Sequence, residues 1–414
     1  MLGSHRYGLV VAGLCTGALS QFLYVSSYNG TVTTLDMSGV SECPNGMAGK
    51  EAVEMKILGN STACGTNPSY LVPDQQEKLV YCIDEAWQTG RGALTAMKTC
   101  SGEKRILDGG VRNEVPINGP VFGGLFDNGK KMAVSNFGNE SVSVWDVSSP
   151  QNLQLGSSVN FILDEPGASD KQLVSKPHQT LVDPSGNFVV VSDFGADMIR
   201  VFSVRNGDFI PAGEYKVTKG SGPRHAAFTT VKKEGDVERA KMVLVNELRP
   251  EIDVYDVVYK SGNMTLEKLN STTPIHGEGT RAPKDAFPSE VVISSDDRFV
   301  IISSRNENNL RSPTFINNGT QPSDPIINFK FDVSTGKLSD PQEIAAGGRF
   351  PRHFSMNEAG TLLAVALQKD GLVVLIPRDP ATGKLGPKPV AFARLAEGVS
   401  SVIFSGKVEC QAEQ

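Results

Sequence analysis

KPHQTLVDPSGNFVVVSDFGADMIRVFSV, residues 176–204, is the stretch that decides the fold of this chain. Its Val, Ile and Phe residues form short runs separated by turn residues, which is typical of strands in a meandering antiparallel sheet. The tetrapeptide DPSG at 183–186 predicts a tight turn, because Pro presets φ and Gly ends the turn. We therefore expect strands at His178–Val182, Phe188–Ser192 and Met198–Val204.

The same unit recurs along the chain, each time after a proline. Steps of about 50 residues indicate repeated sheet units, which must stack on their neighbours to bury their faces. With an N-terminal fragment, FLYVSSYNGTVTTLDM at 22–37, the copies predict an all-β fold, a seven-bladed β-propeller of four-stranded antiparallel blades. Pairing of Phe22–Ser26 with Val399–Phe404 is expected to close the ring and remove exposed sheet edges. The prolines that open the copies are Pro68, Pro120, Pro177, Pro223, Pro288 and Pro351.

Four motifs in chain order carry a family resemblance. They are PHQTLVDPSGNFVVVSDFGAD at 177–197, GPRHAAF at 222–228, PSEVVISSDDRFVIISSRNE at 288–307 and FPRHFSMNEAGTLLAVALQ at 350–368. Together they resemble the lactonase family of seven-bladed propellers, which includes bacterial 6-phosphogluconolactonases and fungal 3-carboxy-cis,cis-muconate cyclases. The similarity extends over about Leu23 to Phe404 and is weakest in the first third, through Cys100.

Polar residues gather where the propeller brings strand ends together. The start of a first strand and the end of an antiparallel second strand lie on the same face of the ring. Three of the four histidines beyond the N-terminal segment occupy such starts. First-strand starts carry His178, Arg224, His225, Ser289, Glu290, Arg352 and His353, and second-strand ends carry Asn136, Asp193, Glu247, Arg305 and Gln368.

The resemblance to fungal cyclases implies a catalytic set in which a histidine, two arginines and a glutamate take part. The matching residues are His178, Arg224, Glu247 and Arg305. We expect substrate contacts from His225, Glu290, Arg352 and His353. Structural roles compete with these: the histidines beside proline can lock neighbouring blades, Arg352 can pair with an acidic side chain, and Asp193 and Asp197 can cap a turn.

Arginines facing a water-accessible cleft suit a small anionic organic acid or lactone, because guanidinium binds carboxylate or phosphate bidentately. The resemblance therefore implies an enzyme like 3-carboxy-cis,cis-muconate cyclase, which forms or opens a lactone. A 6-phosphogluconolactonase-like hydrolase and a non-catalytic secreted glycoprotein that binds or adheres are the alternatives. Nearby arginines are expected to keep Glu247 ionised as base or positioning group. His178 is predicted to be the better proton donor, because the unperturbed pKa of a histidine is about 6.5.

The N-terminus predicts export. Residues 1–20 combine Arg6, a short apolar run and small residues at Ala18 and Ser20, as a cleaved signal peptide does, which leaves the propeller as residues 21–414. Cys15 would leave with this segment, and four of the remaining cysteines, Cys43, Cys64, Cys82 and Cys100, predict one or two disulfides, with Cys410 as the odd one. Glycosylation sequons begin at Asn29, Asn60, Asn139, Asn263, Asn270 and Asn318.

Composition excludes several other functions. Lys and Arg total 40 against 46 acidic residues, and no basic run occurs, which argues against a nucleic-acid partner. Dinucleotide and P-loop glycine motifs and the GxSxG elbow are missing, so no cofactor is expected. No CxxC or Cys/His cluster indicates a metal site, and no run is long enough to predict a membrane span. Asn306–Pro325 is expected to be a long loop beside the channel mouth or a disordered excursion, and the oligomeric state is left open.

Overall fold

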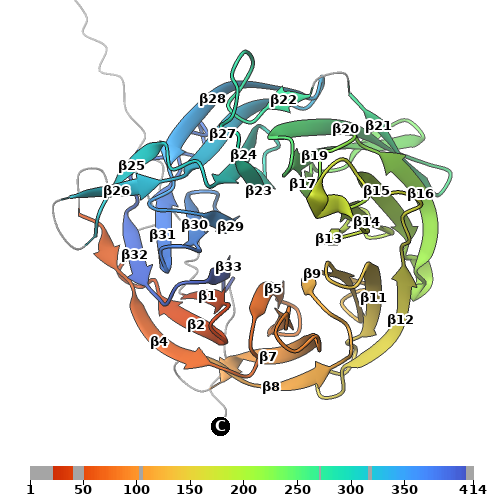
Figure 1. Ribbon diagram of the computed structural model, residues 1–414, viewed down its shortest axis with the longest axis horizontal. Coiled ribbons are helices and arrows are strands. Elements are labelled where there is room, and N and C mark those ends of the chain that lie inside the picture. The colour runs from red at the N-terminus through yellow and green to blue at the C-terminus, as the bar shows by residue number, and fades with distance from the viewer. Residues whose placement is uncertain (1–21, 41–50, 102–105, 270–271, 316–318, 407–414) are drawn as a thin grey trace, which may run out of the picture.

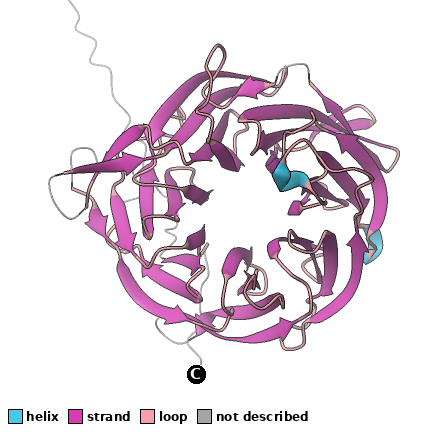
Figure 2. Ribbon diagram, viewed as in Figure 1, coloured by secondary structure: helices cyan, strands magenta, loops and turns pink. Residues whose placement is uncertain are grey.

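The structure is a computed structural model that describes residues 22–40, 51–101, 106–269, 272–315 and 319–406. Seven small antiparallel sheets stand side by side in a ring around a central channel (Figure 1). Strands account for nearly all of the regular structure (Figure 2). The predicted seven-bladed propeller is therefore confirmed, whereas the predicted signal segment 1–20 lies outside the described residues.

Each of the first four blades has four strands, numbered from the channel outward in the list that follows. Blade 1 consists of β33 (Val399–Phe404), β1 (Phe22–Ser27), β2 (Thr31–Asp36) and β4 (Lys56–Ser61); blade 2 of β5 (Pro68–Asp74), β6 (Leu79–Asp84), β7 (Ala93–Ser101) and β8 (Ile106–Glu114); blade 3 of β9 (Pro120–Phe126), β10 (Lys131–Asn136), β11 (Ser141–Asp146) and β12 (Gln154–Asn160); blade 4 of β13 (Pro177–Val182), β14 (Phe188–Asp193), β15 (Met198–Ser203) and β16 (Ile210–Lys216).

Blade 6 also has four strands, whereas blades 5 and 7 carry additional ones. Blade 5 consists of β17 (Pro223–Phe228), β19 (Val237–Asn246), β20 (Glu251–Lys260) and β21 (Asn263–Lys268), with β18 (Lys232–Glu234) and β22 (Thr273–Pro274) attached; blade 6 of β23 (Phe287–Ile293), β24 (Phe299–Arg305), β27 (Pro325–Asp332) and β28 (Lys337–Ala345); blade 7 of β29 (Pro351–Met356), β30 (Leu362–Leu367), β31 (Leu372–Pro377), β32 (Ala391–Arg394) and β3 (Val53–Glu54). Two short 3₁₀ helices, η2 (Asp170–Gln172) and η3 (Arg205–Gly207), lie in the connections.

Two strand pairings join the ends of the chain. β1 pairs antiparallel with β33, with Leu23 opposite Phe404, so the predicted closure of the ring is confirmed. β3 also crosses to the outer edge of blade 7, where it pairs in parallel with β32. This second pairing was not predicted, and it covers an edge that would otherwise expose unpaired backbone groups.

The core lies between neighbouring blades. Val190 and Ile199 of blade 4, for example, pack in one buried cluster with Met242, Leu244 and Tyr255 of blade 5. Because each middle strand is covered on both faces, its residues read as a continuous apolar run. Full burial of each such aliphatic side chain is worth about 1.5–3 kcal/mol. These contacts hold the blades rigidly around the channel.

Residues 176–204, with which the sequence analysis began, form the three predicted strands to within one residue at each strand end. In its turn, Asp183 accepts a hydrogen bond from the Phe188 amide at 2.7 Å, and Gly186 takes the positive φ of 70° that glycine tolerates. The expectation for Asn306–Pro325 was wrong. This stretch forms a hairpin of β25 (Leu310–Pro313) and β26 (Thr320–Ser323), which lies against blade 7 because Phe315 stacks on Phe392 with ring centroids 4.5 Å apart.

Two features bear on the export prediction. Cys64 and Cys82 form a disulfide that ties the segment before β5 to β6, so one of the predicted bridges is confirmed. Four sequon asparagines are exposed, namely Asn29, Asn60, Asn139 and Asn263. The other two, Asn270 and Asn318, lie outside the described residues, as do Cys43 and Cys410.

Among the described residues, no helix has the length and apolar character needed to cross a bilayer.

Candidate active site

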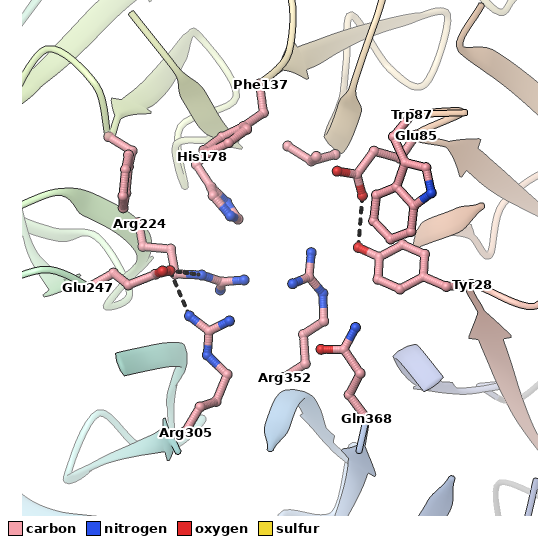
Figure 3. Close-up of a pocket in the computed structure, with 12 residues that line it drawn as sticks. Tyr28, Glu85, Trp87, Phe137, His178, Arg224, Glu247, Arg305, Arg352 and Gln368 are labelled. Carbon is pink, nitrogen blue, oxygen red and sulfur yellow. Dashed lines mark hydrogen bonds and ion pairs between the residues drawn. The ribbon is translucent and has the colours of Figure 1, made fainter. Parts of the chain in front are cut away.

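A cavity of about 220 Å³ opens at one mouth of the central channel. Its walls come from all seven blades, so distant parts of the chain meet there (Figure 3). The lining residues are Tyr28, Glu85, Trp87, Val121, Phe137, His178, Phe194, Arg224, Glu247, Arg305, Arg352 and Gln368. All four residues of the predicted catalytic set are among them, so the prediction that they share one cavity is confirmed.

A β-bulge in the innermost strands turns one ring of side chains toward this mouth. In blade 4, Pro177 pairs with Asp193 and Gln179 pairs with Ser192, which leaves His178 as the extra residue. Arg224 of blade 5 and Arg352 of blade 7 are the extra residues of identical bulges. A bulge re-aims the side chain that it inserts. The bulges therefore direct His178, Arg224 and Arg352 into the cavity, where the regular alternation of a strand would not place them all.

The second ring comes from residues at the end of the second strand of a blade or directly after it. Glu247, for example, follows β19, and Arg305 is the last residue of β24. Because the second strands all end at the same face, residues at this position converge on the mouth. The members of this ring that line the cavity after β1, β6, β10, β14, β19 and β30 are Tyr28, Glu85, Phe137, Phe194, Glu247 and Gln368.

Glu247 is held between two buried arginines. Its Oε2 accepts a hydrogen bond from Arg305 Nη2 at 2.6 Å and lies 2.9 Å from Arg224 Nε, an ion-pair contact without hydrogen-bond alignment. Arg224 Nη1 donates to the Ser289 carbonyl at 2.6 Å, and Arg305 Nε donates to the Phe287 carbonyl at 3.1 Å. Burial raises the pKa of Glu247, but the two arginines outweigh burial and leave that pKa below its ordinary value. The expectation that Glu247 is ionised at neutral pH is therefore confirmed.

Arg352 is the arginine of the cavity without a carboxylate partner among the described residues. Its guanidinium lies over the Tyr28 ring, with Cζ 5.3 Å from the ring centroid, and no described residue accepts a hydrogen bond from it. Figure 3 shows it extending into the space between the Glu247 cluster and Glu85. A guanidinium in this position can take a carboxylate or phosphate of a ligand bidentately.

The wall opposite Glu247 carries a second carboxyl group. Glu85 Oε2 accepts a hydrogen bond from Tyr28 Oη at 2.8 Å, and the Tyr28 ring packs against Trp87 with centroids 4.4 Å apart. Burial raises the pKa of Glu85, against the smaller opposing effects of Arg352 and Tyr28. Glu85 and Glu247 thus occupy equivalent places in different blades, and their surroundings shift their pKa values in opposite directions.

His225, Glu290 and His353 do not line the cavity, although they were expected to contact the substrate. They form a buried layer in which His225 Nδ1 lies 3.0 Å from Glu290 Oε1 and His353 Nε2 lies 3.5 Å from Glu290 Oε2. His353 Nδ1 also accepts the Val402 amide at 3.1 Å. Each histidine follows the bulged arginine by one residue, so it lies one step further into the channel. Arg352, the fourth residue of this expected set, does line the cavity.

One protein-family model, described as a seven-bladed β-propeller lactonase, matches residues 19–399. The chain belongs to the lactonase family. This match extends through the N-terminal third, where the sequence motifs are weakest.

Among relatives of this lactonase-family chain is a probable 6-phosphogluconolactonase of Arthroderma benhamiae, 27% identical over 337 residues, which span 80% of this chain and 79% of the relative. A 6-phosphogluconolactonase of Bacillus subtilis is 23% identical over 321 residues, 77% of this chain and 82% of that one. The solved structure of the periplasmic gluconolactonase of Pseudomonas aeruginosa superposes with a TM-score of 0.72 at 20% identity, covering 92% of this chain and 98% of that chain. At this identity the superposition shows a common fold.

Two polar residues predicted at the mouth have structural roles instead. Asn136 and Asp193 are the buried last residues of β10 and β14, and the cavity is lined by the residues that follow them, Phe137 and Phe194. Asp193 accepts hydrogen bonds from Ser175 Oγ at 2.6 Å and from the Lys176 amide at 2.8 Å. Asp197 accepts the Gly220 and Gly222 amides at 2.6 and 2.8 Å, so the turn-capping alternative for both aspartates is confirmed.

The premise for His178 as a proton donor was wrong. Burial lowers the pKa of His178 well below its ordinary value, and the positive charge of Arg224 lowers it further. The ring packs edge-on against Phe137 and His225, with centroids 5.5 and 5.0 Å away. His178 is therefore neutral at pH 7, and a neutral imidazole is able to accept a proton.

Three residues of the opposite wall, Tyr28, Glu85 and Trp87, were missed at the sequence level. A signal was present, because Tyr28 and Glu85 stand one place after the second strands of blades 1 and 2, as Glu247 does in blade 5. Within the described part of the chain, no group of three or more His, Cys, Asp or Glu side chains is arranged to hold a metal ion.

Proposed function

We propose that this protein is a lactone hydrolase that acts on a small anionic sugar lactone, as its relatives named 6-phosphogluconolactonase suggest. The observation that carries the proposal is the composition of the cavity. Three arginines face it, one carboxylate, Glu247, neutralises part of their charge, and the neutral base His178 stands beside them. Such a site attracts an anion and offers a proton acceptor next to it.

Arg352 supplies the ligand-binding charge in this proposal. It has no ion-pair partner among the described residues, so it binds the phosphate or carboxylate of the substrate. Arg224 and Arg305 are fixed by Glu247 and by backbone carbonyls. Preorganised donors of this kind stabilise the negative charge that develops on the carbonyl oxygen during attack.

His178 acts as the general base. It takes a proton from a water molecule whose oxygen forms a bond to the lactone carbonyl carbon, and the bond from that carbon to the ring oxygen then breaks. Arginines contribute to the low pKa of His178 in the empty site. A bound anion offsets their field, so the basicity of His178 rises when the substrate is in place.

The cyclase reaction, which was the first expectation, would use the same side chains to form a lactone from an unsaturated acid. The names of the relatives described above favour hydrolysis. A pH-stat assay with 6-phosphogluconolactone, glucono-δ-lactone and 3-carboxy-cis,cis-muconate separates the candidates. Acid release from the lactones supports the proposal. Conversion of the muconate alone would support the cyclase, and ligand binding without turnover of any of the three would support the non-catalytic alternative.

We also propose that the protein is exported. The Cys64–Cys82 disulfide and the exposed sequon asparagines suit an oxidising, glycosylating route. Mass spectrometry of the protein from its native host should find a mature N-terminus near Gln21 and glycan on some of the six sequons. An intact Met1 in a cytosolic fraction would contradict export.

A further inference from the structure

Glu85 and Glu247 stand at the same position of two blades but are held by different partners. Glu247 contacts two guanidinium groups through one oxygen. The Glu85 carboxyl group has no ion pair among the described residues, and it accepts a hydrogen bond from the neutral Tyr28 hydroxyl. Figure 3 shows both on opposite sides of the cavity, with the Arg352 guanidinium between them. A ligand held by Arg352 therefore has an ionised carboxylate on one side and an unpaired carboxyl group on the other.

We propose that Glu85, positioned by Tyr28, is the general acid that protonates the ring oxygen of the lactone as it leaves. The inference rests on the proposed hydrolase function and adds a catalytic residue to it. Hydrolysis of an alkyl lactone releases an alkoxide, which is a poor leaving group unless a proton reaches it. The described cavity lining offers few alternatives: Glu247 is ionised between arginines, and His178 is neutral and serves as the base.

The hydrogen bond from Tyr28 engages one oxygen of the Glu85 carboxyl group. Tyr28 Oη donates to Oε2, so Oε2 acts as the carbonyl oxygen and Oε1 is the place for the proton. Burial is the main cause that raises the pKa of Glu85; the negative Asp84 adds to it, and Arg352, Arg224 and the Tyr28 hydroxyl oppose it. The Tyr28 ring, packed on Trp87, fixes the hydroxyl in place.

Protons and electrons are conserved in the proposed hydrolysis. Water gives its proton to His178 as its oxygen bonds to the carbonyl carbon, and the tetrahedral intermediate then expels the ring oxygen. The electron pair of the breaking carbon–oxygen bond takes the proton of Glu85. The products are a hydroxyl group and a carboxylic acid, which ionises, and the proton on His178 is available to restore Glu85 through solvent. No further reactant is required.

Glu85→Gln tests the acid role by leaving-group dependence. The amide keeps the size of the side chain and an oxygen that accepts from Tyr28, but it carries no transferable proton. With glucono-δ-lactone, whose ring oxygen leaves as an alkoxide, kcat should fall about 10²- to 10⁴-fold. With dihydrocoumarin, whose oxygen leaves as a phenolate, the loss should be less than about tenfold, since a good leaving group needs little protonation. Glu77→Gln, an exposed change in a turn of the same blade, is the matched control and should leave both rates unchanged.

Tyr28→Phe gives a second readout and keeps the proposal testable if Glu85→Gln does not fold. The Tyr28 hydrogen bond lowers the pKa of Glu85, so its removal should raise that pKa. An acid is active when protonated, so activity is lost as the pH rises through its pKa. The alkaline limb of the kcat/KM profile should therefore move to higher pH in this variant. A merely structural Tyr28 would leave the limb in place.

Two results overturn the inference alone: full activity of Glu85→Gln on glucono-δ-lactone, or an equal loss on both lactones, which indicates a positioning role. An unmoved alkaline limb in Tyr28→Phe would also contradict it. Failure of the wild-type protein to open these two lactones and 6-phosphogluconolactone would instead overturn the hydrolase function on which the inference rests.

Discussion

Arg352 differs from the other two arginines of the cavity by its surroundings. Arg224 and Arg305 share Glu247 and donate to backbone carbonyls, so their charge is partly neutralised and their geometry is fixed. The Arg352 guanidinium packs over Tyr28 and has no carboxylate partner among the described residues. Its net contribution to binding an anion is therefore expected to be large.

Arg352→Ala should weaken binding of the anionic substrate selectively. A hydrogen bond to a charged group is worth about 1.5–3 kcal/mol, so KM for a phosphorylated lactone should rise about 10- to 150-fold. KM for the unphosphorylated lactone of the same ring should change little. Arg394→Ala, on the outer strand of the same blade, is the control and should behave as wild type. An equal effect of Arg352→Ala on both lactones would contradict the assignment.

The pH dependence of activity should report the low pKa of His178. A base acts when unprotonated, and burial and Arg224 hold the pKa of His178 well below about 6.5. Activity should therefore persist as the pH falls through 6.5 and decline only at lower pH. The acid limb of the kcat/KM profile measures this directly. An acid limb centred near 6.5 would show that His178 has an ordinary pKa.

At the scale of the elements, a buried aspartate organises the loops next to Arg305. Asp324, directly before β27, accepts the amides of Asn306, Glu307 and Asn308 at 3.0, 2.7 and 2.7 Å. It also accepts the Phe350 amide at 2.6 Å, and the Arg305 Cζ lies 5.0 Å from the Phe350 ring. One carboxylate thus fixes the connection after β24 and the one before β29.

Asp324→Ala should destabilise the fold by about 3 kcal/mol or more, because four backbone amides lose their acceptor at once. Asp324→Asn, which keeps one acceptor oxygen, should lose less. Asp164→Ala, in an exposed connection, is the control and should stay within about 0.5 kcal/mol of wild type. Urea unfolding measures all three. A cost for Asp324→Ala as small as that of the control would contradict the role of Asp324.

The strands were predictable where the apolar pattern and turn residues agree, as in β13 to β15. The bulges were not, because one inserted residue leaves the apolar pattern unchanged while it redirects His178 and Arg352. The wall of Tyr28 and Glu85 was missed because blades 1 and 2 carry the weakest motifs. The pKa of His178 depends on burial and on arginines from other blades, and no local sequence contains that information.

At the scale of the whole molecule, the ring concentrates buried histidines in its channel. Burial lowers the pKa of His225 well below its ordinary value and lowers the pKa of His353 to about 4. Glu290 between them has its pKa raised by burial. The unfolded chain therefore binds more protons at the histidines in mildly acidic solution than the folded chain does, and Glu290 opposes this in part.

His353→Gln should flatten the loss of stability in acid. A histidine with a folded pKa below its unfolded value contributes stability that is present above about pH 6.5 and is lost as the pH falls. For His353 the window runs from about 6.5 down to about 4. Over it, the free energy of unfolding of the wild type should fall more steeply than that of the variant, by up to about 1.4 kcal/mol per pH unit. Urea unfolding at several pH values checks this, and parallel curves would contradict it.

We propose that the seven blades position His178 beside three arginines, in a cavity where a small anionic lactone is opened. The most direct test follows acid release from 6-phosphogluconolactone by pH-stat, with the spontaneous rate subtracted, for the wild type and for His178→Ala. The wild type should exceed the spontaneous rate, and His178→Ala should lower kcat about 10²- to 10⁴-fold, as for loss of a general base. A wild-type rate equal to the spontaneous rate, or a variant as active as the wild type, would contradict the claim.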